Sequence, residues 1–213
     1  MKKFAIVGIV VALLLTLIGG ATVAAKPSVI VVPRNFATIQ AAIDAASPGD
    51  KIIVQAGTYA GATVTKAVEI VGTDAVINDG PKTHPFLRAG FYFPPDYTGN
   101  GATIRGFKFV GEEQSGYVDD GKLDFAIFSR GANNVTIEHN VMVNSMQAIT
   151  NWHGSGWNIS HNEIDGLWAL CGGGIGILVG SRMSDKPAND NRVAHKKISA
   201  DVSPDCGFYT TGG

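Results

Sequence analysis

The sequence lacks an excess of basic residues, because its 17 Lys and Arg are balanced by 18 Asp and Glu for a formal net charge of -1. The sequence therefore has no excess of positive charge of the kind that binds nucleic acid. The chain also lacks a second long apolar run after its N-terminal one, so we expect no membrane span elsewhere. Leucine is scarce after Ala25, where Val, Ile, Phe and Ala dominate beside abundant Gly, Asn and Thr. That composition predicts many short strands and tight turns.

The N-terminal segment 1–25 has the layout of a secretory signal peptide. Lys2 and Lys3 precede an apolar run from Phe4 to Ile18, and small residues lead to a cleavage site after Ala25. An uncleaved anchor is the alternative, because the run could just span a bilayer. No cysteine lies near the site, which argues against a lipid anchor. We therefore expect a protein that is secreted, periplasmic or on the cell surface, with one domain over residues 26–213 and a formal charge near -3 after Lys2 and Lys3 are removed.

One short pattern recurs along the mature chain. It appears in "TIRGFKFV", "TIEHNVMV", "NISHNEID" and "RVAHKKIS", whose second residues are Ile104, Ile137, Ile159 and Val193, spaced 33, 22 and 34 apart. An earlier copy has Ile70, which precedes Ile104 by the same interval that separates Ile159 from Val193. A unit of about 22 residues, with about a dozen inserted in the longer intervals, accounts for the spacing, as in repeat architectures.

Each copy alternates apolar and polar residues, as a strand with one buried face does. Leucine-rich repeats and parallel β-helices both have units of this length, but the copies contain no leucine. The sequence therefore predicts an all-β parallel β-helix, a solenoid in which equivalent residues stack ~4.8 Å apart. Asn140 and Asn162 are then expected to form a ladder.

The start of the mature chain predicts a short amphipathic helix with Ile39, Ile43 and Ala46 on one face. The turn "SPGD" then ends the helix, and residues 51–55 predict a strand. The helix, this turn, the strand "IIVQAGTY" and the later "VTIEHN" units resemble the pectin-lyase-like superfamily, from Val29 to the C-terminus. The resemblance implies a right-handed parallel β-helix with an N-terminal capping helix.

The enzyme signatures of that superfamily are mostly missing. The sequence contains no "WIDH"-like stretch of pectate lyases, no "GHG" or "RIK" of polygalacturonases, and none of the downstream motifs of pectin methylesterases. The resemblance therefore implies a scaffold, and no catalytic residue can be carried over.

Extra residues at 111–123, 166–173 and 200–206 predict loops on one side of the stack, where function concentrates in scaffolded proteins. Carboxylates in and beside the first loop could act as an acid/base pair or bind calcium, and nearby aromatic rings could stack on sugars. The alternative is that all of them are ordinary surface residues. The candidates are Asp119, Asp120 and Asp124 for catalysis, Glu112 and Glu113 for calcium, and Tyr117, Trp152 and Trp168 for sugar binding.

Three histidines fall in one slot of the repeat: His139, His161 and His195, where the earlier copy has Gly106. Stacked imidazoles would suit a metal or anion ligand. A slot that also accepts glycine instead favours a corner with positive φ, which His tolerates better than most residues. Both interpretations predict a column of histidines.

The spacing between Cys171 and Cys206 is close to the interval of the last repeat. Residues stacked at strand spacing lie within disulfide range, and export favours oxidation. We expect a disulfide between them, the alternative being two free buried thiols. The last repeat has no capping segment after it, so we also expect the natural chain to extend past Gly213.

Two functions follow from the sequence. The first is a monomeric, exported module that binds a polysaccharide or surface glycan without catalysis. The alternative is a polysaccharide lyase or glycoside hydrolase that acts on an acidic polysaccharide, with calcium as its candidate cofactor.

Overall fold

The computed structural model describes residues 26–96, 98–112, 121–168, 174–181 and 188–199. This part of the chain is mostly β-structure, with one helix, α1 (Ile39–Ala45), and two sheets that contain eleven and six strands. The strands of the larger sheet are β1 (Val29–Val32), β2 (Lys51–Val54), β3 (Gly57–Ala60), β5 (Glu69–Asp79), β8 (Thr103–Val110), β10 (Thr136–Glu138), β11 (Val141–Ser145), β13 (Asn158–Ser160), β14 (Glu163–Leu167), β16 (Arg192–Ala194) and β17 (Lys197–Ser199). Those of the smaller sheet are β4 (Ala62–Thr63), β6 (Lys82–His84), β7 (Leu87–Phe93), β9 (Phe125–Ser129), β12 (Gln147–Trp152) and β15 (Ile175–Gly180).

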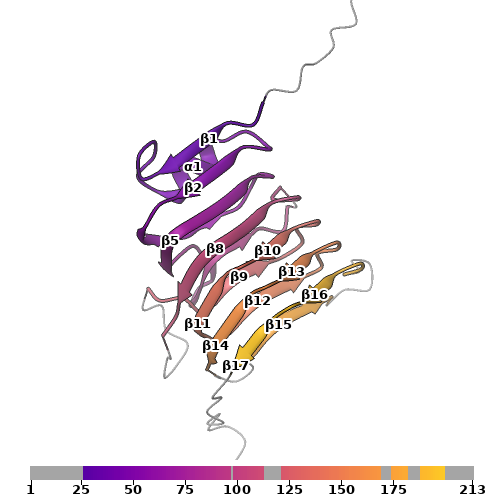
Figure 1. Cartoon of the computed structure of the whole chain (residues 1–213). Helices are drawn as coiled ribbons and strands as arrows, with labels where there is room; N and C mark the ends of the chain where they lie inside the picture. Colours follow the sequence, from indigo (N-terminus) through magenta and orange to yellow (C-terminus); the bar gives the residue numbers. More distant parts are fainter. Residues whose placement is uncertain (1–25, 97, 113–120, 169–173, 182–187, 200–213) are drawn as a thin grey trace, which may run out of the picture.

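Strands of both sheets follow one another in chain order from the N-terminal to the C-terminal end (Figure 1). In the larger sheet the order is β1-β2-β5-β8-β10-β13-β16, and in the smaller sheet it is β4-β7-β9-β12-β15. All of these pairings are parallel, and the only antiparallel pair among the described strands joins β6 to β7. Strands that are distant in sequence therefore become neighbours once per repeat.

The register of the sheets confirms the repeat predicted from the sequence. Ile104 pairs with Ile137, Ile137 with Ile159, and Ile159 with Val193. Ile70 pairs with Ile104, so the earlier copy is also confirmed. The unequal intervals leave this register unchanged, because the extra residues lie between strands.

The hydrophobic core lies between the two sheets. Ile104, Ile137 and Ile159 of the larger sheet belong to the same buried cluster as Phe91 and Ile127 of the smaller sheet. The ring of Phe91 makes edge-on contacts with Phe107 and Phe109, at centroid distances of 5.4 and 5.9 Å. Along β8, for example, Phe107 and Phe109 point inward while Lys108 between them is exposed, as alternation in a strand predicts.

A pair of buried asparagines stabilises the bend that lies at Gly106 within β8 and that follows β10 and β13. The Nδ2 of Asn140 donates to the Oδ1 of Asn162 at 3.1 Å and to the carbonyl of Ile104 at 3.1 Å. The Oδ1 of Asn140 accepts from the backbone N–H of Phe107 at 3.1 Å, and the Nδ2 of Asn162 donates to the carbonyl of Ile137 at 2.8 Å. The predicted asparagine ladder is therefore confirmed, and it satisfies backbone groups that the bend would leave buried and unpaired.

A second corner of the repeat precedes β8, β10, β13 and β16. Its residues with positive φ are Gly101, Asn134, Gly156 and Asp190. The residues directly before these positions are linked from one repeat to the next by hydrogen bonds. The N–H of Asn133 donates to the Oδ1 of Asn100 at 2.7 Å, and the N–H of Ser155 donates to the Oδ1 of Asn133 at 2.8 Å. This corner was not predicted, although its residues recur at the same intervals of 33, 22 and 34.

At the N-terminal end, α1 packs against β1, β2 and β4, as Figure 1 shows beside the first strands. The hydroxyl of Thr38 caps the helix by accepting from the N–H of Ala41 at 3.1 Å, and Ile39 and Ile43 are buried in the core. The predicted turn after the helix is present. The carboxylate of Asp50 accepts from the N–H groups of Ser47 and Ser28, and these hydrogen bonds lower the pKa of Asp50.

Several boundaries differ from those expected. The strand that begins at Lys51 ends at Val54, one residue early, and β1 was not predicted as a separate strand. The expected loop at 166–173 begins later, because Gly166 and Leu167 still belong to β14. Residues 1–25 and 200–206 lie outside the described residues, and so do Cys171 and Cys206. No helix in the described ranges is long and apolar enough to cross a membrane.

We expect Asn140→Leu to lower the free energy of unfolding by about 2–4 kcal/mol, because it leaves the buried Phe107 N–H and Ile104 carbonyl without partners. Denaturant unfolding followed by circular dichroism measures this loss. The control is Asn158→Ala, which removes one exposed hydrogen bond from Arg192 and should change stability by less than about 0.5 kcal/mol. Equal losses in the two variants would contradict a structural role for the ladder.

Candidate functional site

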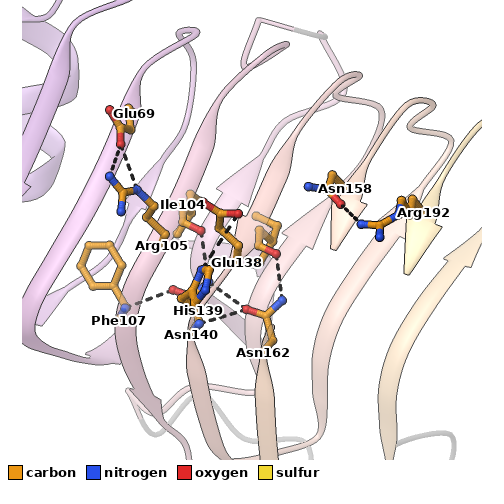
Figure 2. A network of polar contacts seen from close by, with 11 residues as sticks. Glu69, Ile104, Arg105, Phe107, Glu138, His139, Asn140, Asn158, Asn162 and Arg192 are labelled. Atoms are coloured by element: carbon orange, nitrogen blue, oxygen red, sulfur yellow. Dashed lines mark hydrogen bonds and ion pairs between the residues drawn. The ribbon is translucent and has the colours of Figure 1, made fainter. Parts of the chain in front are cut away.

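The outer face of the larger sheet carries a row of paired charges across β2, β5 and β8. The Oε1 of Glu69 accepts from Lys51 at 3.2 Å and from the guanidinium of Arg105 at 2.6 and 2.9 Å (Figure 2). Partial burial raises the pKa of Glu69, but the hydrogen bonds and charges of Arg105 and Lys51 outweigh it, and the pKa lies below its ordinary value. Together the three side chains carry a net charge of +1, and each of them is engaged in an ion pair within the sheet.

The histidine column (His139, His161 and His195) is present where the sequence predicted it. The rings of His139 and His161 are stacked at a centroid distance of 4.8 Å and an angle of 3°, and those of His161 and His195 at 4.7 Å and 13°. All three residues have positive φ, between 47° and 56°, and Gly106 in the same slot has a φ of 76°. The predicted corner with positive φ is therefore confirmed. The residues also remain exposed at the surface, with 61% of the His139 side chain accessible.

A shallow groove of about 340 Å³ lies beside the first histidine of the column. Asp74, Gly106, Lys108 and His139 line it together with apolar side chains of β5, β8 and β11. Because Gly106 has no side chain, the space next to the His139 ring is open on that side and is continuous with the groove.

Asp124 does not have the environment of a catalytic carboxylate. It is 1% exposed, and its Oδ2 accepts from the backbone N–H of Arg88 at 2.7 Å. The backbone N–H of Asp124 also donates to the carbonyl of Arg88, and its carbonyl accepts from Met146 and Gln147. Asp124 thus connects the starts of β7, β9 and β12 by hydrogen bonds. The expectation that it is an exposed loop carboxylate is wrong, because it is buried.

The remaining acidic candidates give no calcium site in the described part of the chain. Glu112 forms an ion pair with Lys122, which occupies its carboxylate with a cation. Glu113, Tyr117, Asp119 and Asp120 lie outside the described residues. Among the described residues, no group of three or more His, Cys, Asp or Glu side chains converges on one metal position.

The outer face of the smaller sheet carries an aromatic cluster. Phe125, Phe128 and Trp168 are buried in it, and the partly exposed Tyr92 and Trp152 pack against them. The rings of Tyr92 and Phe128 lie 6.1 Å apart. Phe91 and Ile127 belong to the core between the sheets, whereas their neighbours Tyr92 and Phe128 belong to this separate cluster.

Polar residues directly follow β9, β12 and β15 at the level of Trp152, which is the last residue of β12. Ser129, the last residue of β9, pairs with Asn151, so Arg130 directly after β9 lies at the level of Trp152 in β12. The guanidinium carbon of Arg130 lies 5.8 Å from the centroid of the Phe128 ring. After Trp152, the Nδ1 of His153 is 3.1 Å from the hydroxyl of Ser181. An aromatic face with hydrogen-bonding groups beside it results; we call it the Trp152 patch (Tyr92, Arg130, Trp152, His153 and Ser181).

Trp168, the other tryptophan predicted to contact sugar, is placed differently. It is 4% exposed, and its Nε1 donates to the carbonyl of Asn144 at 3.2 Å. Its ring offers no exposed face to a ligand, because it is packed into the aromatic cluster.

The sequence did not single out Arg130, His153 or Ser181. The signal that could have found Arg130 is the repeat itself, since Arg130 precedes Trp152 by the length of one basic repeat unit. His153 and Ser181 each follow the last residue of a strand, but their intervals include inserted residues that hide the relation.

Comparison of the chain with family models, with curated proteins and with solved structures finds no match in any of the three. The roles of these side chains therefore follow only from their geometry.

Glu69 predicts a defined acid dependence of stability. Its pKa is lower in the folded chain than its ordinary value of 4.5, so its contribution is complete above that value and is lost as the pH falls below it. Thermal unfolding between pH 6 and pH 3 should show a smaller loss of stability for Glu69→Gln than for the wild type. A steeper loss in the variant would contradict the ion-pair assignment.

The positive φ of the column predicts which substitutions it tolerates. We expect His161→Asn to leave the free energy of unfolding nearly unchanged, because Asn adopts this conformation readily. We expect His161→Val to lower it by about 1–2 kcal/mol, because a side chain branched at Cβ is strained there. Denaturant unfolding of the two variants checks this, and equal stability would contradict the assigned backbone conformation.

Proposed function

We propose that this protein is an exported, non-catalytic module that binds a polysaccharide or surface glycan through the Trp152 patch. The observation that carries the proposal is the partly exposed Trp152 at the end of β12, with polar residues directly after β9, β12 and β15 at the same end. Sugar rings combine apolar C–H faces with hydroxyl edges, and an aromatic side chain with nearby hydrogen-bonding groups matches both. Arg130 and Ser181 are exposed beside it.

The same proposal includes a right-handed parallel β-helix of the pectin-lyase-like type. It is supported by parallel registers that repeat in both sheets and by bends at matching positions of successive repeats. Such a stack presents equivalent outer positions at regular intervals, which suits an extended polymer better than a small ligand. The N-terminal residues 1–25, with the layout of a signal peptide, support export.

Binding without turnover is favoured over lyase or hydrolase activity by the state of three carboxylates that the structure describes. Acid/base catalysis on a sugar needs two carboxyl groups that face a common substrate. Asp124 is buried against backbone groups of β7, Glu69 is held by two cations, and Glu112 is paired with Lys122. These three carboxylates are thus engaged within the protein.

We expect Trp152→Ala to weaken glycan binding by about tenfold, as truncation of a central aromatic residue commonly does. Affinity electrophoresis through native gels containing pectin, alginate or glucuronan, with and without calcium, measures the binding. The matched control is Phe86→Ala, which removes a ring that is 47% exposed outside the patch.

Two results would contradict the proposal. One is that the wild type migrates in gels containing a polymer as it does in gels without polymer, which means that it binds none of these polymers. The other is that Phe86→Ala weakens binding as much as Trp152→Ala, which means that the retention is unspecific. Release of sugar products by the wild type would support the enzymatic alternative instead.

A further inference from the structure

We propose that the histidine column binds one divalent transition-metal ion, of the type of Cu²⁺, Ni²⁺ or Zn²⁺, through two neighbouring imidazoles. The proposal concerns the larger sheet and is independent of glycan binding at the Trp152 patch. Imidazole suits these ions, and affinity for a given nitrogen site rises from Ni²⁺ to Cu²⁺.

The spacing of the rings is close to what a shared ion requires. With metal–nitrogen bonds of ~2.0–2.1 Å, two nitrogens on one ion lie no more than ~4.2 Å apart. The centroids of His139 and His161 are 4.8 Å apart, and those of His161 and His195 are 4.7 Å apart. Because the stacked rings are nearly parallel, with angles of 3° and 13° between their planes, they must rotate about χ1 and χ2 out of the stack so that their nitrogen lone pairs converge on one ion.

The surroundings leave room for this rotation. All three histidines are exposed, and Gly106 in the preceding position of the column has no side chain to hold the His139 ring from that side. The groove next to Gly106 and His139 adds open space. The backbone beneath the rings is fixed by the Asn140–Asn162 ladder (Figure 2), so the imidazoles are carried on rigid strands.

A carboxylate lies beside the first ring of the column. The Oε2 of Glu138 is 4.0 Å from the Nδ1 of His139. This distance is too long for a hydrogen bond, but the negative charge of Glu138 favours a cation at this end of the column.

The column also fixes the expected stoichiometry. His161 belongs to both neighbouring pairs, whereas His139 and His195 are separated by two strand spacings and cannot share an ion. One ion per chain is therefore expected at the tighter site, with water completing its coordination. The site needs two protein ligands, which agrees with the absence of a converging group of three among the described residues.

Isothermal titration of the tag-free full chain with Ni²⁺ and Cu²⁺ tests the proposal. His161→Asn disrupts both pairs and keeps the backbone conformation, and the double variant His139→Asn/His195→Asn leaves His161 alone. Mutation of a residue that only hydrogen-bonds to a metal ligand already costs about 10- to 100-fold in metal affinity. Removing a ligand itself should cost at least as much, so we expect each of these variants to bind the ion at least about tenfold more weakly than the wild type.

The control is the double variant His84→Asn/His153→Asn, which removes the two remaining histidines of the five in the chain. It should bind one ion as tightly as the wild type. Wild-type affinity in His161→Asn, or an equal loss in the control, would overturn the proposal. Circular dichroism of each variant separates loss of ligands from loss of fold.

Discussion

The structure depends on parallel strands that pair in register across intervals of different length. Each strand satisfies its backbone groups with the strand of the preceding repeat, and the inward side chains then stack Ile on Ile from β5 to β13. Register is strictly specified here, because a shift by one residue would turn this buried row to solvent. The bends must therefore fall at the same place in every repeat, which explains why residues with positive φ recur together.

The histidines, asparagines and isoleucines of the repeat could be predicted from the sequence because each depends on the period alone. The presence of Gly106 in the histidine slot indicates the positive φ of this corner from the sequence alone. The corner at Asn134 and Gly156 carries the same signal, but its residues are small and polar and resemble ordinary turns.

The candidate site was predicted less well, because exposure is decided by contacts that the period does not describe. Trp152 and Trp168 look alike in the sequence, yet the indole of Trp168 donates to Asn144 and is buried, whereas Trp152 lies at the end of its strand beside Gly180. Asp124 follows an acidic stretch, and only the distant backbone of Arg88 shows why it is buried. Long-range partners of this kind have no local sequence signature.

The unequal intervals between repeats have a consequence for how this molecule can vary. The interval from Ile137 to Ile159 is shorter than that from Ile159 to Val193, yet both pairs have the same register. The length of the connection between two repeats therefore does not affect how their strands pair. A foreign peptide inserted into the longer connection would therefore leave the pairing of the strands on either side unchanged, and peptides of different lengths could be inserted there.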